Sequence, residues 1–199
     1  MRSTIVQRLG APARAAALLA AFACDAAAQP AAPAGSDDPF ARRGWHLELG
    51  GHWAPETWNY NRSREVMQGI RAGLTYGVGN GITLLAAGPL YHVSQRGVDG
   101  YLLGATFGVR GRVLRWGRAS AYLEFEVGVS ESDTFVPPGG TRFNYLALGG
   151  AGATIRVRRR IHLLAGLKWI HVSNNSLAGR SRNPDIEAVG PYASLLVGF

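Results

Sequence analysis

Cysteine, charge and long apolar runs are all scarce in this sequence, and each shortage excludes a class of protein. The chain has 199 residues and one cysteine, Cys24, which excludes a disulfide framework and a metal site built from cysteines. Charged residues make up 17%, below the usual share of about a quarter in soluble domains. No apolar run reaches the roughly 18 residues that a transmembrane helix needs, so a helical membrane protein is excluded as well.

The first residues have the form of a secretory signal. Three arginines precede a short apolar stretch, which is followed by small residues of a cleavage site at 26–28. We therefore predict an exported protein, with a signal peptide at 1–28 and a flexible lead-in at 29–44. The remaining chain is still basic. Anionic lipid is the more fitting partner for it, because no nucleic-acid-binding motif is found.

What the sequence has in abundance is glycine, with 27 residues, and apolar residues that recur at every second position. Such alternation predicts β-strands with one apolar face and one face of glycine or charged residues. The third strand is an exception, because it is apolar on both faces. The predicted strands run over residues 45–53, 70–78, 82–91, 101–110, 121–129, 143–157, 161–173 and 187–199.

The lengths of the connections between these strands distinguish a membrane barrel from a soluble β-sandwich, whose strands also alternate between apolar and polar residues. Short turns near Asn80, 114–117 and 158–160 alternate with longer polar connections, and this arrangement is typical of outer-membrane barrels. We therefore predict an all-β fold, an eight-stranded antiparallel transmembrane β-barrel over residues 45–199, in the bacterial outer membrane. Aromatic residues near the strand ends fit an interfacial girdle: Trp45, Trp53, Tyr101, Trp169 and Phe199.

Charged residues on the less apolar face point into the predicted barrel. Eight strands leave an interior that side chains fill, so we expect these charges to pair as a polar plug and not to line an open pore. The residues concerned are Glu48, Arg71, Arg110, Glu124, Glu126, Arg156 and Lys168.

Polar residues interrupt the apolar face where the seventh strand ends. His171 and Ser173 continue the face of Trp169, and Glu187 continues the apolar face of the last strand. The last two strands form a hairpin, so Glu187 can lie beside His171 on the outer wall. A serine, a histidine and a carboxylate supply a nucleophile, a general base and an acid that orients the base. In the alternative interpretation, the strand leaves the hydrocarbon before His171 and these residues are hydrated loop ends.

The sequence His-Val-Ser-Asn at residues 171–174, with Asn183 four residues before Glu187 and a last strand ending in phenylalanine, resembles the lipid A 3-O-deacylase (PagL) family. Members of this family are eight-stranded outer-membrane barrels that hydrolyse the ester-linked acyl chain at position 3 of lipid A. The clear resemblance covers only the C-terminal part of the chain, from His171 to the end.

The resemblance implies a role for each matching residue. Ser173 would be the nucleophile, His171 the base and Glu187 its partner, whereas Asn174 and Asn183 would form or support the oxyanion hole. The loop before Glu187 departs from the family pattern because it is slightly longer.

Three charged residues in that loop leave alternatives open. Asp185 shares the strand face of Glu187 and is a rival for the acid role. Arg180 and Arg182 are candidates for binding the phosphates of lipopolysaccharide, with solvated loop charge as the alternative.

The function predicted from these residues is ester hydrolysis on lipid A of lipopolysaccharide, in the outer leaflet of the outer membrane. The residue types require no metal and no cofactor, and no nucleic-acid partner is expected. A homodimer is left open as an assembly. The alternative function is a non-enzymatic structural or adhesive barrel whose long loops bind a surface partner.

Overall fold

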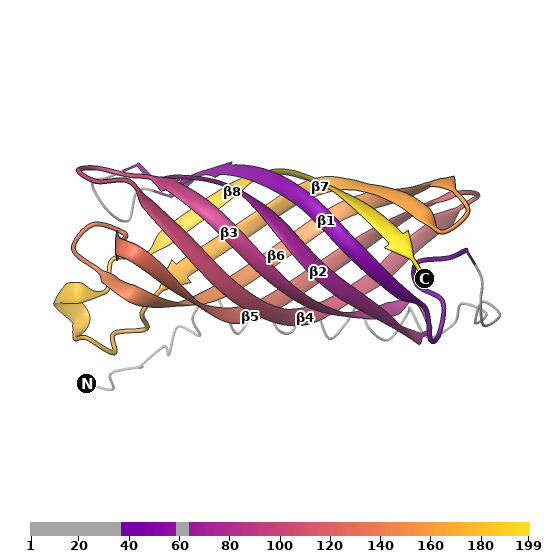
Figure 1. The fold of residues 1–199 in the computed structure, drawn as a ribbon, viewed down its shortest axis with the longest axis horizontal. Helices are drawn as coiled ribbons and strands as arrows, with labels where there is room; N and C mark the ends of the chain where they lie inside the picture. The colour runs from indigo at the N-terminus through magenta and orange to yellow at the C-terminus, as the bar shows by residue number, and fades with distance from the viewer. Residues whose placement is uncertain (1–36, 59–63) are drawn as a thin grey trace, which may run out of the picture.

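The computed structural model describes residues 37–58 and 64–199, so the predicted signal peptide at 1–28 lies outside the described residues. Eight antiparallel strands close into one barrel, because β8 pairs with β1 (Figure 1). This confirms the predicted fold. The strands are β1 (Trp45–Pro55), β2 (Val66–Gly79), β3 (Ile82–Ser94), β4 (Gly100–Trp116), β5 (Ala119–Val136), β6 (Thr141–Arg158), β7 (Ile161–Ser173) and β8 (Ile186–Gly198).

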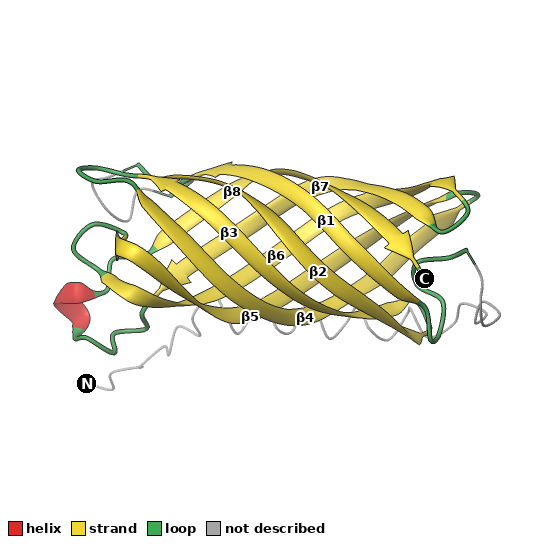
Figure 2. Ribbon diagram, in the orientation of Figure 1, coloured by secondary structure: helices red, strands yellow, loops and turns green. Residues whose placement is uncertain are grey.

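The connections are short at one end of the barrel and long at the other, as predicted (Figure 2). Between β2 and β3, Asn80 and Gly81 both have positive φ, which is the geometry of a two-residue hairpin turn. We call this end periplasmic and the opposite end extracellular, as in outer-membrane barrels. The extracellular connection at 137–140 is shorter than expected, because β5 and β6 continue as paired strands beyond their predicted ends.

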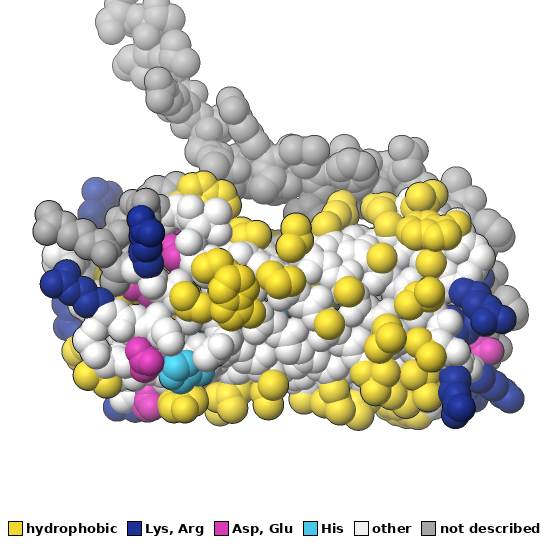
Figure 3. Space-filling view, turned by 90° about the horizontal axis from the view of Figure 1, so that it is seen from above, with side chains coloured by type: hydrophobic (Ala, Val, Ile, Leu, Met, Phe, Trp, Pro, Cys, Tyr) yellow, Lys and Arg dark blue, Asp and Glu magenta, His cyan; other side chains and the backbone are white. Residues whose placement is uncertain are grey.

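Alternation along each strand separates an apolar wall from a polar lumen. In β4, Leu103 is 61% exposed on the outside, whereas Arg110 is 2% exposed on the inside. Apolar side chains are spread over the outer wall, and arginines gather at the two ends (Figure 3). Such a wall is suited to contact with lipid acyl chains.

Charged side chains meet in the middle of the lumen. Arg110 binds Glu124 at 2.7 Å and Glu48 at 3.0 Å. Three cations face three carboxylates, so the predicted polar plug is confirmed and its charges balance. The charged plug consists of Glu48, Arg71, Arg110, Glu124, Glu126 and Lys168, none more than 6% exposed.

Arg156, which was expected in the plug, lies instead near the periplasmic end. It is 39% exposed, and its nearest carboxylate is that of Asp37, at 3.8 Å. The reason is its position only two residues before the end of β6.

Residues 37–44 pack into the periplasmic end of the barrel, so this part of the predicted flexible lead-in is ordered. Phe40 is 3% exposed, and its ring lies between that of Tyr122 and the guanidinium of Arg112. Asp38 binds Arg112 at 2.6 Å and Arg115 at 3.2 Å. An aromatic anchor and a buried ion pair therefore hold the segment in place. Among the described residues, no helix is long and apolar enough to cross a membrane.

Candidate active site

The candidate site lies on the outer wall where β7 meets β8. The strand register places His171 directly opposite Glu187, and β7 ends two residues later at Ser173. The loop that follows carries the short 3-10 helix η2 (Arg180–Arg182), at the end of the barrel far from the C-terminus (Figure 1). The predicted partners therefore come together through backbone pairing.

The carboxylate of Glu187 binds two side chains of β7. Its Oε1 lies 2.8 Å from His171 Nδ1, and its Oε2 accepts a hydrogen bond from the indole nitrogen of Trp169. The Trp169 ring also stacks on the imidazole, with centroids 5.9 Å apart. With Nδ1 donating to the carboxylate, Nε2 of the neutral imidazole is left as a proton acceptor. The sequence predicts Trp169 only as a residue of the aromatic girdle, and its contacts with Glu187 and His171 could not be seen from the sequence.

Ser173 is 7% exposed and continues the face that carries His171. Its hydroxyl accepts a hydrogen bond of 3.3 Å from the backbone nitrogen of Asn175. Within the described residues, the hydroxyl has no hydrogen bond to His171. A serine–histidine mechanism would therefore require this contact to form when substrate binds, as catalytic contacts often tighten only then.

Asn174 and Asn183 lie beside Ser173, but their groups are engaged in holding the loop. Asn174 N donates to Asn183 Oδ1 at 3.0 Å, and Asn174 Nδ2 donates to Thr141 Oγ1 at 3.0 Å and to the Arg182 carbonyl at 2.5 Å. The geometry thus argues against the oxyanion donor predicted at Asn174, because both of its donor groups are occupied. The N–H directed at Ser173 belongs to Asn175, which sequence reasoning did not single out.

Asp185, the rival acid, lies near the same imidazole. Ligand atoms of His171, Asp185 and Glu187 are all within 4.8 Å of one another. The carboxylate that His171 hydrogen-bonds is that of Glu187, which lies directly opposite it in the strand register. Imidazole and carboxylate are also ligand types that divalent cations accept, so among the described residues these three form the group that could hold a metal ion.

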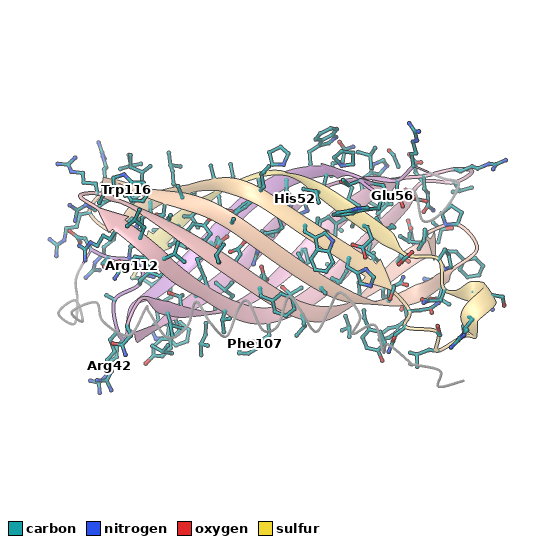
Figure 4. The ribbon with its side chains drawn as sticks, turned by 180° about the vertical axis from the view of Figure 1, so that it is seen from behind. Arg42, His52, Glu56, Phe107, Arg112 and Trp116 are labelled. Carbon is teal, nitrogen blue, oxygen red and sulfur yellow. The ribbon has the colours of Figure 1, made fainter. Side chains whose placement is uncertain are left out.

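The connection between β1 and β2 borders the site from the other side. Thr57 N donates a hydrogen bond of 2.8 Å to the carbonyl oxygen of Glu187. Glu56 forms an isolated antiparallel β-bridge with Ala188. Burial and the neighbouring carboxyl of Glu65 raise the pKa of Glu56 to about 8. Glu56 lies at the extracellular end of the barrel (Figure 4). The site therefore has strongly acidic surroundings that strand periodicity could not reveal.

A groove of about 300 Å³ runs along the outer wall beside His171 and Ser173. It is bounded by β5, β6 and the start of the loop after β7, and it opens to the side of the barrel. Its other lining residues are Val127, Gly128, Tyr145, Leu146, Ala147 and Asn175.

The two loop arginines differ in their surroundings. Arg182 donates to the carbonyl of Gly140 at 3.4 Å, and its guanidinium lies 5.6 Å from the ring centre of Phe135. Arg180 is exposed at the start of η2. Arg182 therefore braces the loop against its neighbour, whereas Arg180 faces the surroundings.

Comparison with known proteins identifies the architecture. The chain is similar to Neisserial surface protein A (NspA), with a TM-score of 0.57 and 13% identity over 78% of this chain and 97% of that one. The fold is that of a small outer-membrane β-barrel. With the apolar wall, it agrees with the predicted location in the bacterial outer membrane. No family model and no curated protein matches the sequence.

Two further outer-membrane proteins give weaker matches. OprG from Pseudomonas aeruginosa has a TM-score of 0.47 and 12% identity, covering 81% of this chain and 98% of that one. AlkL has the same score and identity, covering 86% of this chain and 95% of that one.

Proposed function

We propose that this barrel is an outer-membrane esterase that removes the 3-O-linked acyl chain from lipid A of lipopolysaccharide. The observation that carries the proposal is the hydrogen bond between His171 and Glu187 beside Ser173, on a wall suited to lipid. Polar groups on such a wall are costly, so they mark functional positions. The resemblance of residues 171–174 to the lipid A 3-O-deacylase family names the substrate.

In the proposed reaction, His171 Nε2 takes the proton of Ser173, and the serine oxygen attacks the acyl carbonyl. The N–H of Asn175 donates to the serine oxygen in this structure; once that side chain turns to the substrate, the N–H is released and would stabilise the negative charge on the former carbonyl oxygen. His171 then returns the proton to the departing sugar hydroxyl. Water hydrolyses the acyl-enzyme by the same route, so one ester and one water give a hydroxyl group and a free fatty acid. Glu187 keeps the imidazole oriented throughout.

The groove beside Ser173 fits this substrate class, because an acyl chain can enter it sideways from the membrane. The long connections at this end support an extracellular position for the site, on the side where lipopolysaccharide is found. Arg180 is exposed nearby and suits a lipid A phosphate. Substrate would therefore arrive by lateral diffusion and would never enter the lumen.

The direct test is mass spectrometry of lipid A from cells that do or do not express the protein, together with lipid A treated with the purified, folded barrel. We expect loss of one ester-linked hydroxyacyl chain and release of the corresponding free fatty acid. Unchanged lipid A in both experiments would contradict the proposal and favour a structural or adhesive barrel.

A further inference from the structure

Exposed arginines surround much of the periplasmic rim. They come from three separate places in the chain: the segment before β1, the end of β4 with its turn, and the end of β6 with its turn. We define this arginine collar by its exposed members, which are Arg42, Arg43, Arg115, Arg118, Arg158, Arg159 and Arg160.

Backbone contacts bring these three places together around the rim. The carbonyl of Arg118 accepts a hydrogen bond of 2.9 Å from Arg156 N, which joins the turns after β4 and β6. The carbonyl of Arg160 accepts one of 2.7 Å from Gly198 N, beside β1. Arg42 extends from the same end of the barrel as Trp116 (Figure 4). The collar is therefore a fixed surface and not a set of scattered charges.

Carboxylates at this end neutralise little of the collar. In the part of the chain that the structure describes, the two acidic side chains near the rim are those of Asp37 and Asp38. Asp38 is buried against Arg112 and Arg115, and Asp37 lies 3.7 Å from Arg159. No carboxylate among the described residues forms a salt bridge with the other five arginines of the collar. As far as the described residues go, their guanidinium groups are available to an external anion.

Aromatic side chains place the collar at the depth of lipid headgroups. Trp45 is 45% exposed, Trp116 is 49% exposed and Phe199 is 70% exposed, all at the periplasmic end. Exposed tryptophans of membrane proteins lie at the interface between acyl chains and water. Arginines directly beside them therefore lie level with the phosphate groups, which a guanidinium binds through two parallel hydrogen bonds.

We propose that the arginine collar binds the headgroups of anionic phospholipids in the periplasmic leaflet of the membrane. Anionic lipid fits better than a soluble anionic polymer, because the arginines adjoin the aromatic belt as well as the turn tips. This surface is at the opposite end of the barrel from the esterase site, so the proposal does not depend on the proposed reaction.

The test uses the folded barrel in a neutral detergent, titrated with phosphatidylglycerol or with phosphatidylcholine and followed by native mass spectrometry. We expect preferential binding of phosphatidylglycerol, weakened by salt. The variant Arg118→Gln/Arg158→Gln should bind it about tenfold more weakly, since each basic residue near an anionic surface adds to binding. The double lysine variant at the same positions keeps the charge and should retain most of the affinity.

A matched control removes two arginines from the extracellular end, in Arg64→Gln/Arg96→Gln, and should leave the affinity unchanged. An equal loss in this control would overturn the proposal, as would unchanged binding in the collar variant. Inorganic phosphate at millimolar concentration should not displace the lipid; full displacement would indicate a general anion site instead. The proposal would also be refuted if the barrel bound isolated peptidoglycan and showed no preference between the two lipids.

A second measurement locates the bound lipid and shows that the variants are folded. The fluorescence of Trp116 is obtained as the difference between the wild type and Trp116→Phe. Phosphatidylglycerol with brominated chains should quench this fluorescence, and it should quench it less in Arg118→Gln/Arg158→Gln. Each variant should keep the heat-dependent gel shift of a closed barrel. Quenching that is equal in all folded variants would argue against binding at the collar.

Discussion

The two ends of the barrel are both polar, yet among the described residues the periplasmic end is strongly basic and the extracellular end is nearly balanced in charge. Around the periplasmic end, nine described arginines face two aspartates, which are the collar together with Arg112 and Arg156 against Asp37 and Asp38. At the extracellular end, seven acidic residues face five arginines, namely Glu56, Glu65, Asp99, Glu131, Asp133, Asp185 and Glu187 against Arg64, Arg96, Arg142, Arg180 and Arg182. The polarity of a rim alone therefore does not reveal its function.

One carboxylate at each end makes the difference clear. Asp38 is held by two guanidinium groups, which always carry a charge. Burial alone would raise the pKa of Asp38, but Arg112 outweighs it and holds this pKa below the usual range. Glu187 is held instead by an indole and by the imidazole of His171, and an imidazole has one ring nitrogen that donates and one that can accept a proton. The first arrangement is suited to stability, and the second is suited to proton transfer.

The largest effect that would sharpen this comparison comes from the nucleophile and the base. We expect Ser173→Ala and His171→Ala each to lower deacylation about ten-thousandfold or more, because the covalent step is lost. Release of fatty acid from lipid A by each purified, folded variant measures this effect. Ser181→Ala, in the same loop, is the control and should keep full activity. Full activity in either site variant would refute the assigned roles.

A smaller loss is expected from the acid. Glu187→Ala should lower the deacylation rate about a thousandfold, since an orienting acid contributes less than the nucleophile. Asp185→Ala should cost no more than about tenfold, because Asp185 is not the residue opposite His171. The same fatty-acid assay shows which of the two variants loses more activity. A larger loss in Asp185→Ala than in Glu187→Ala would assign the role of the acid to Asp185.

At the periplasmic end the corresponding change should affect stability and not activity. Asp38→Ala removes the buried ion pair with Arg112 and the bond to Arg115, and should lower the free energy of unfolding by about 3 kcal/mol. Asp37→Ala is the matched control and should cost less than about 1 kcal/mol, because its ion pairs are long and partly exposed. Urea unfolding in detergent measures both, and equal effects would contradict the distinction.

The smallest effect concerns pH at the extracellular end. The pKa of Glu56 is raised to about 8 from 4.5, so folding favours its protonated form. Its contribution to stability is therefore fully present below about pH 4.5 and is lost as the pH rises through about 8. Between pH 6 and pH 9 the urea midpoint should fall slightly more for the wild type than for Glu56→Gln. Parallel curves would show that this carboxyl does not titrate in that window.

The barrel could be predicted largely from the sequence because its wall has a strict period of two. Parity alone placed His171 and Glu187 on the same face, and the hairpin then made them neighbours. The turn at Asn80 followed from the requirement for positive φ in a two-residue hairpin.

The contacts that complete the site depend on the register between strands and on loop packing, which periodicity does not encode. Asn174 finds Thr141 on another strand and Arg182 in its own loop, so its donors are unavailable for an oxyanion. Phe40 reaches Tyr122 through the open periplasmic end, a contact that only the closed barrel creates. The contacts with Thr141 and with Tyr122 join residues that are distant in the sequence, so only the three-dimensional structure reveals them.

The contact between Thr57 and the backbone of Glu187 lies at the seam where the first and last strands meet. A chain that has formed its last hairpin but has not yet joined its two ends possesses His171 and Glu187 as a pair, yet lacks this support. The proposed activity should therefore appear only at the final moment of biogenesis. Release of fatty acid would then measure barrel closure, because closed barrels would release it and assembly intermediates would not.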